Sequence, residues 1–237
     1  QKDVYEWDQK VKWIFTVVEK LTFGTLGPKS TNMTISYLLS INDQLYNERP
    51  KILLNGGNIT IDDSNISQMA YYNYINRFGE VYSENPSNLS GKKTTEINAS
   101  ESFKLINDSS LYMNNGQIVV NAKDIKIYQS DIRNRNIWSK ENVGVVKLNA
   151  VNNIQLNDAD ITVTSITAGN RGDIHINGES FDSINSQIAI IDERKGISGS
   201  VNLDFNESIK MVDSQVVSIG QSKLTRDTNG NDINIKS

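Results

Sequence analysis

The sequence predicts an all-β protein: a parallel β-helix with three strands per turn and about six or seven turns, with a partly helical cap at its N-terminal end. Three observations predict this fold. Apolar-x-apolar pairs recur along the chain, and an acid or amide followed by a small residue recurs at one fixed phase. Asparagine is abundant and proline scarce, with 30 and 3 residues. Short strands joined by repeated tight turns give this pattern.

Composition narrows the functional classes. Of the 237 residues, 37% are hydrophobic and 8% aromatic, which is lean for a globular core but too apolar for a disordered chain. The net charge is -4 and no stripe of Lys or Arg is present, so nucleic-acid binding is not expected. Cysteine is absent, which excludes disulfides and thiolate metal sites. We expect no cofactor or metal, and no membrane insertion, because the longest apolar run, residues 13–18, is too short to span a bilayer.

The first apolar pair opens each predicted repeat. Its copies are Ile59/Ile61, a degenerate copy at Ile97, Ile118/Val120, Val146/Leu148, Ile174/Ile176, Val201/Leu203 and Ile233/Ile235. The second members are 36, 23, 28, 28, 27 and 32 residues apart. A period of two indicates a strand with one face inward. Repeats this short leave no room for the helix of a βαβ unit.

A second apolar pair and a third apolar position complete each repeat. The second pairs are Phe103/Leu105, Ile125/Ile127, Ile154/Leu156, Phe181/Ser183 and Ile209/Met211. The third positions are Ile66, Leu111, Ile132, Ile161, Ile188 and Val216. Stacking of the repeats would place equivalent strands in parallel about 4.8 Å apart. The alternative is a β-sandwich, whose strands alternate in direction and need no corner residue in phase.

Two residues at a fixed phase before the third position predict a corner. The first of them is Asp63, Asp108, Gln129, Asp158, Asn185 and Asp213 in successive repeats, and the second is Ser64, Ser109, Ser130, Ala159, Ser186 and Ser214. We expect the small residues to lie in one file where only a small side chain fits. The acid or amide beside each one would satisfy backbone groups exposed by the bend.

Two regions depart from the repeat. Residues 1–50 place apolar side chains at helical spacing from Val4 to Leu21, with a shorter helical stretch over 37–46, and we expect a cap or a docking helix there. Residues 51–237 would form the β-helix, with a long aromatic loop at 67–94. Its ligand-binding candidates are Tyr71, Tyr72, Tyr74, Arg77, Phe78 and Tyr82. These side chains would contact a ligand or pack the loop onto the side of the helix. Asn88 is the expected glycosylation site.

No catalytic residue is predicted. His175 lies between two inward isoleucines and should point to solvent, which is a poor setting for a catalytic triad. Arg133 and Arg135 are expected in a turn near Trp138, the best candidate groove for a carbohydrate-active enzyme, but the sequence places no acids beside them.

Three segments carry a resemblance to a known family: Gly172-Asp-Ile-His-Ile-Asn, Gly116-Gln-Ile-Val-Val-Asn-Ala and residues 154–161. Over residues 55–237 the chain resembles the β-helical repeats of filamentous-haemagglutinin-type exoproteins of two-partner secretion. The resemblance implies a right-handed coil, export across an outer membrane and adhesion to cells or matrix. The secretion-directing domain that opens such exoproteins is not recognisable in residues 1–50.

The function predicted from these observations is adhesion. We expect a secreted or cell-surface bacterial protein that binds glycan, matrix or other cells through its sides and loops. One alternative is a filament subunit that stacks end to end through an unfinished repeat at Ile233 and Ile235, because open strand edges pair. A second alternative is a polysaccharide lyase or hydrolase.

Overall fold

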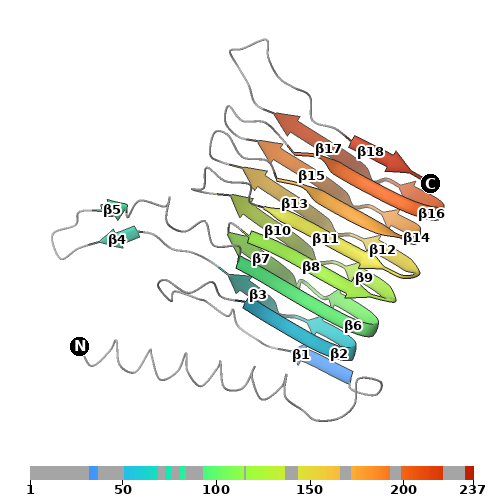
Figure 1. Cartoon of the computed structure of the whole chain (residues 1–237), viewed down its shortest axis with the longest axis horizontal. Helices are drawn as coiled ribbons and strands as arrows, with labels where there is room; N and C mark the ends of the chain where they lie inside the picture. The colour runs from blue at the N-terminus through green and yellow to red at the C-terminus, as the bar shows by residue number, and fades with distance from the viewer. Residues whose placement is uncertain are drawn as a thin grey trace.

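The computed structural model describes residues 32–36, 51–68, 73–75, 81–83, 93–114, 116–136, 144–165, 172–192, 199–220 and 233–237. Every regular element in these ranges is a β-strand (Figure 1). No helix in this part of the chain is long and apolar enough to cross a membrane. The strands are β1 (Asn32–Ser36), β2 (Lys51–Asp62), β3 (Asn65–Gln68), β4 (Asn73–Ile75), β5 (Val81–Ser83), β6 (Lys93–Ile106), β7 (Ser110–Asn114), β8 (Gly116–Ala122), β9 (Asp124–Tyr128), β10 (Asp131–Asn136), β11 (Val145–Ala150), β12 (Asn153–Asn157), β13 (Asp160–Ser165), β14 (Ile174–Ile184), β15 (Gln187–Asp192), β16 (Val201–Val212), β17 (Gln215–Gly220) and β18 (Ile233–Lys236).

The described strands form one ten-stranded sheet, one six-stranded sheet and one two-stranded sheet. The six-stranded sheet runs in the order β17-β15-β13-β10-β7-β3, and all its pairings are parallel. In the ten-stranded sheet, β6 pairs with β8 through its early residues and with β9 through its late residues. In the same way, β14 pairs with β11 through its early residues and with β12 through its late residues. The pairings β6-β8-β11-β14-β12-β9 therefore close a ring. Among the described strands, only β4 and β5 form an antiparallel pair.

Successive repeats pair residue for residue, and Figure 1 shows their strands stacked side by side. The first strand segments align Ile118, Val146, Ile174, Val201 and Ile233. The second segments align Ile59, Phe103, Ile125, Ile154, Phe181 and Ile209. The third segments align Ile66, Leu111, Ile132, Ile161, Ile188 and Val216. Each apolar position of the sequence repeat thus occupies its own column.

The prediction for the first repeat was wrong. Ile61 pairs with Leu105 and so belongs to the second segments, and the first segment of that repeat contains Leu54, which pairs with Ile97. The step between equivalent residues is 43 residues, as between Asn55 and Asn98, and not 36. The first and second segments of this repeat both lie in β2 and are separated by a corner at Gly56, where the register between β2 and β6 shifts. The sequence Gly56-Gly57 is typical of a turn before a strand, and this pattern led to the wrong prediction that Ile59 opens the repeat.

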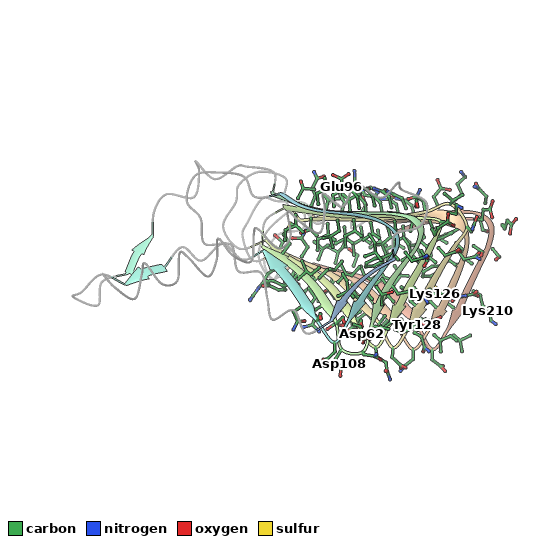
Figure 2. All side chains as sticks on the ribbon, turned by 90° about the horizontal axis from the view of Figure 1, so that it is seen from below. Asp62, Glu96, Asp108, Lys126, Tyr128 and Lys210 are labelled. Atoms are coloured by element: carbon green, nitrogen blue, oxygen red, sulfur yellow. The ribbon has the colours of Figure 1, made fainter. Side chains whose placement is uncertain are left out.

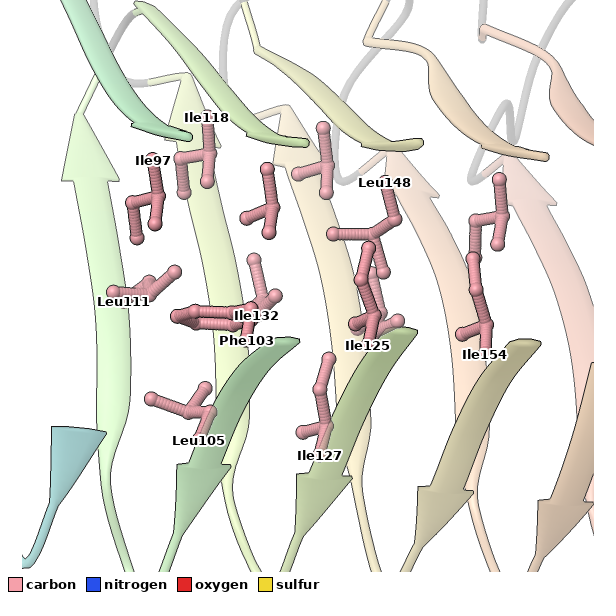
Figure 3. Close-up of a cluster of buried hydrophobic side chains, with 14 of the residues drawn as sticks. Ile97, Phe103, Leu105, Leu111, Ile118, Ile125, Ile127, Ile132, Leu148 and Ile154 are labelled. Atoms are coloured by element: carbon pink, nitrogen blue, oxygen red, sulfur yellow. The ribbon is translucent and has the colours of Figure 1, made fainter. Parts of the chain in front are cut away.

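The core is the interior enclosed by the three sets of segments (Figure 3). Figure 3 shows Ile97 and Ile118 from first segments facing Leu105 and Ile127 from second segments, and all four are 1% exposed or less. Aliphatic side chains dominate, and Phe181 stacks on Phe205 with ring centroids 5.2 Å apart. Because every inward side chain lies one repeat away from an equivalent side chain, apolar surface is buried continuously along the stack.

The residues at the predicted corner adopt left-handed backbone conformations. Positive φ values between 45° and 57° occur at Asp63, Asn107, Asp108, Gln129, Asp158, Asn185 and Asp213. Asn and Asp tolerate this region better than other residues that carry a Cβ. Side chains also link neighbouring corners: Asn107 Nδ2 donates to Asp62 Oδ1 at 2.7 Å, and Asn185 Nδ2 donates to Asp158 Oδ1.

The small corner residues lie in one file joined by hydrogen bonds. The backbone N–H of Ser64 donates to Ser109 Oγ at 3.1 Å, and that of Ser109 donates to Ser130 Oγ at 3.2 Å. Further along, Ala159 N–H donates to Ser186 Oγ, and Ser186 N–H donates to Ser214 Oγ, both at 3.1 Å. Each serine hydroxyl also donates to a carbonyl of its own repeat, as Ser130 does to Tyr128 O at 2.8 Å. The hydroxyls therefore satisfy backbone groups of two repeats at once.

Glycine precedes first segments because the repeats approach each other closely there. A Cβ on Gly199 would lie 1.6 Å from the carbonyl oxygen of Gly172, and a Cβ on Gly172 would lie 2.2 Å from Val163 Cγ1. No side chain fits at such distances. Gly199 thus packs against the backbone of Gly172, and Gly172 packs against the side chain of Val163.

Two substitutions in the corner file should change stability in opposite directions. Ser109→Ala removes the acceptor for the buried Ser64 N–H, so the free energy of unfolding should fall by about 1–3 kcal/mol. Ala159→Ser supplies the one hydroxyl that the file lacks and should raise the free energy of unfolding by about 1 kcal/mol. Urea unfolding measures both changes. Equal losses in the two variants would contradict the hydrogen-bonded file.

Candidate binding site on the outer face of the six-stranded sheet

Five charged and aromatic side chains gather on the outer face of the six-stranded sheet. They come from β7, β10 and β13, and we call them the Arg133 cluster: Tyr112, Asp131, Arg133, Arg135 and Asp160. Parallel pairing sets Arg133 beside Tyr112 and Asp131 beside Asp160. The residues that alternate with them, Ile132 and Asn134, are 0% and 1% exposed. Strand alternation therefore directs the five cluster side chains outward.

The structure corrects two expectations about this site. Arg133 and Arg135 lie in β10, not in a turn, and acids stand beside them, since Asp131 is on the same strand and Asp160 on the next. Ile132 was predicted to lie in the third strand of its repeat, but the extension of that strand through Arg135 was not predicted, because Asn134 interrupts the apolar alternation. This asparagine is buried because its Nδ2 donates to Gly116 O at 2.8 Å and to Val145 O at 3.3 Å. Trp138 lies outside the described residues.

Charges within the cluster are unequally compensated. Arg133 Nη2 donates to Asp131 Oδ2 at 2.6 Å, and the two side chains remain 52% and 31% exposed. Arg135 is exposed and makes no ion pair with any described residue. Partial burial raises the pKa of Asp131 above its ordinary 3.8, while Arg133 lowers this pKa and Asp160 raises it. Among the described residues, the cluster therefore offers the guanidinium of Arg135 without an ion pair, the aromatic side chain of Tyr112 beside Arg133, and two carboxylates on adjacent strands.

A pH titration tests this arrangement. The folded protein should hold the Asp131 proton more tightly than the unfolded chain, so this carboxyl favours folding below pH 3.8. The contribution should be lost as the pH rises through the folded pKa. Nuclear magnetic resonance titration of Asp131 should give a lower pKa in Asp160→Asn and a higher pKa in Arg133→Gln. A wild-type pKa at or below 3.8 would contradict the account.

Most of the aromatic candidates fall outside the described residues. Tyr71, Tyr72, Arg77, Phe78 and the glycosylation candidate Asn88 all do so, as does the expected N-terminal helix. The backbone of Tyr74 pairs with that of Tyr82 in the antiparallel pair of β4 and β5. Within residues 1–50 the described part is β1, which pairs with β2. The sequence did not predict this strand.

His175 and the predicted assembly residues Ile233 and Ile235 lie in the first strand segments. His175 lies between the buried Ile174 and Ile176, is half-buried, and has its Nδ1 3.3 Å from Asn202 Nδ2. Ile233 and Ile235 lie on β18 and continue two core columns, in register with Val201 and Leu203. They are 41% and 55% exposed.

The outer faces of the ten-stranded sheet carry different chemistry. Figure 2 shows Glu96 on one outer face, and Lys126 and Lys210 on another. These lysines belong to second segments, whereas Glu96 belongs to a first segment. In the described part of the chain, no three His, Asp or Glu side chains gather closely enough to hold a metal ion.

Comparisons of the chain with protein-family models, with curated proteins and with solved structures found no match. The resemblance to haemagglutinin-type repeats therefore stays a prediction from the sequence motifs.

Proposed function

We propose that this protein is an adhesive β-solenoid, secreted or displayed on a bacterial surface, that binds a glycan or protein of a cell surface or matrix through its side. The Arg133 cluster is the observation that carries the proposal. Tyrosine and arginine are the residue types that most often supply binding energy in interfaces. Here Tyr112 and Arg133 share one outward column on neighbouring strands of the six-stranded sheet, and Arg135 follows two residues along β10.

The proposal includes the finer architecture. We infer a right-handed parallel β-helix in which three strand segments make one turn. The pairings that support it are the residue-for-residue parallel registers of three separate sets of segments. A coil of this kind is rigid because each turn is paired on both sides. Rigidity lowers the entropic cost of presenting a binding surface.

The guanidinium of Arg135, which makes no ion pair within the described ranges, defines the group that the partner should supply. Arg135 presents a planar fork that suits a carboxylate or sulfate in a two-pronged hydrogen bond. Tyr112 lies one repeat away from Arg133 and offers an aromatic surface for a sugar ring or an apolar side chain. A partner with acidic groups on an extended surface therefore fits the cluster.

Binding to immobilised extracellular material tests the proposal. The purified chain should bind at least one surface in a panel of matrix proteins, sulfated or carboxylated polysaccharides and whole cells. Arg135→Ala and Tyr112→Ala should each weaken binding about tenfold, the effect of losing roughly 1.4 kcal/mol. Lys210→Ala is the matched control, because this exposed cation lies on another face; it should leave binding unchanged.

Two outcomes would overturn the proposal. Absence of binding across the panel would remove adhesion through this face, as would equal effects of Arg135→Ala and Lys210→Ala. Release of new sugar ends from a bound polysaccharide would favour a carbohydrate-active enzyme instead. In that case the stacked pair of Asp131 and Asp160 would be its candidate acid and base, since the two carboxylates have unequal surroundings.

A further inference from the structure

A file of asparagines runs along the outer face of the first strand segments. Parallel pairing places the same outward position in register over five successive repeats, at Asn55, Asn98, Asn121, Asn149 and Asn177. The amides of the first four are joined in sequence. Asn98 Nδ2 donates to Asn55 Oδ1 at 3.0 Å, Asn121 Nδ2 to Asn98 Oδ1 at 2.7 Å, and Asn149 Nδ2 to Asn121 Oδ1 at 2.7 Å.

Hydrogen-bond capacity remains in this file after the amides have bonded to each other. A side-chain amide carries two N–H donors and two acceptor lone pairs. Asn121 uses one donor to reach Asn98 and accepts one bond from Asn149. One N–H and one lone pair of Asn121 are therefore available on the half-buried outer face. The orientation of each amide is fixed by its neighbours, so the available groups repeat at the strand spacing of about 4.8 Å.

The surroundings of the file favour a ligand without charge. The adjacent outward column holds Glu96, Val119, Lys147 and His175 in successive repeats. The acid at Glu96 accepts a hydrogen bond from Asn98 at 3.1 Å, and Val119 lies beside Asn121 on the same strand. One acid and one base leave this stretch near neutrality, unlike the Arg133 cluster. Amides bond hydroxyls, while a valine side chain contacts the C–H face of a sugar ring.

The geometry points to this face as a binding site for an uncharged polysaccharide that lies along the asparagine file, with its hydroxyls bonded to Asn121 and Asn149 and a ring face on Val119. A polymer suits the file because the sugar units and the asparagines both recur along one axis. Each further repeat of the protein therefore adds the same contacts. A fixed array of donors and acceptors also binds without first being ordered, which reduces the entropic cost. The site uses residues distinct from the Arg133 cluster, so the two bind independently.

The test uses the full chain and insoluble or soluble neutral polysaccharides as probes: cellulose, chitin, β-glucan and mannan. We expect co-sedimentation or calorimetric binding to at least one of them. Replacing both Asn121 and Asn149 by alanine should weaken that binding about tenfold or more, because two to four hydrogen bonds are lost. Asn157→Ala is the matched control, an exposed asparagine on a second segment, and should bind as the wild type does.

A second variant separates ligand contacts from folding. Val119→Lys leaves the amide file intact but places a charged chain over the proposed ring contact, so it should also lose binding while keeping the wild-type circular dichroism and melting temperature. Failure to bind any of the four polysaccharides would overturn the inference, as would undiminished binding by Val119→Lys. Loss of neutral-polysaccharide binding in Arg135→Ala alone would assign the ligand to the Arg133 cluster and also overturn it.

Discussion

Parallel pairing in register between successive repeats is the constraint on which the rest of the structure depends. When Ile118 lies beside Val146 and Val146 beside Ile174, every other residue of those repeats is fixed at one strand spacing from its equivalent. The inward columns then become a continuous apolar core, and the outward columns become files of similar side chains. A slip of one residue would turn every apolar side chain to solvent.

The corner file shows how this register is held where the chain bends. A corner exposes backbone groups that no strand can pair, and the serine hydroxyl resolves this by donating within its own repeat and accepting from the preceding one. The left-handed residue just before it makes the bend. Because one hydroxyl bonds to two repeats, the corner file also opposes a shift of register between them. The same logic, applied to the outer face, joins the amides of Asn98, Asn121 and Asn149.

The sequence could predict the columns but not all the segments. Repeated apolar pairs and the acid-serine phase have a period that is visible without a structure, and the parallel all-β sheets follow from it. The first segment at Leu54 was missed because a glycine corner separates it from Ile59. The extension of β10 past Ile132 was missed because the buried Asn134 is a polar residue type. Burial of that asparagine depends on carbonyls of Gly116 and Val145, which no local pattern reveals. Asp160 reaches Asp131 only through pairing between repeats.

Interspin distances along one outward column test the stacking most directly. Thr60, Lys104, Lys126, Gln155, Asp182 and Lys210 share a column on the second segments. With spin labels on cysteines at Thr60 and Gln155, three spacings apart, the backbone separation should be about 14 Å. For Thr60 and Lys210, five spacings apart, it should be about 24 Å. Electron paramagnetic resonance should show the second distance longer than the first by about 10 Å. Equal distances in the two pairs, or a shorter distance for Thr60 and Lys210, would contradict the stacked repeats.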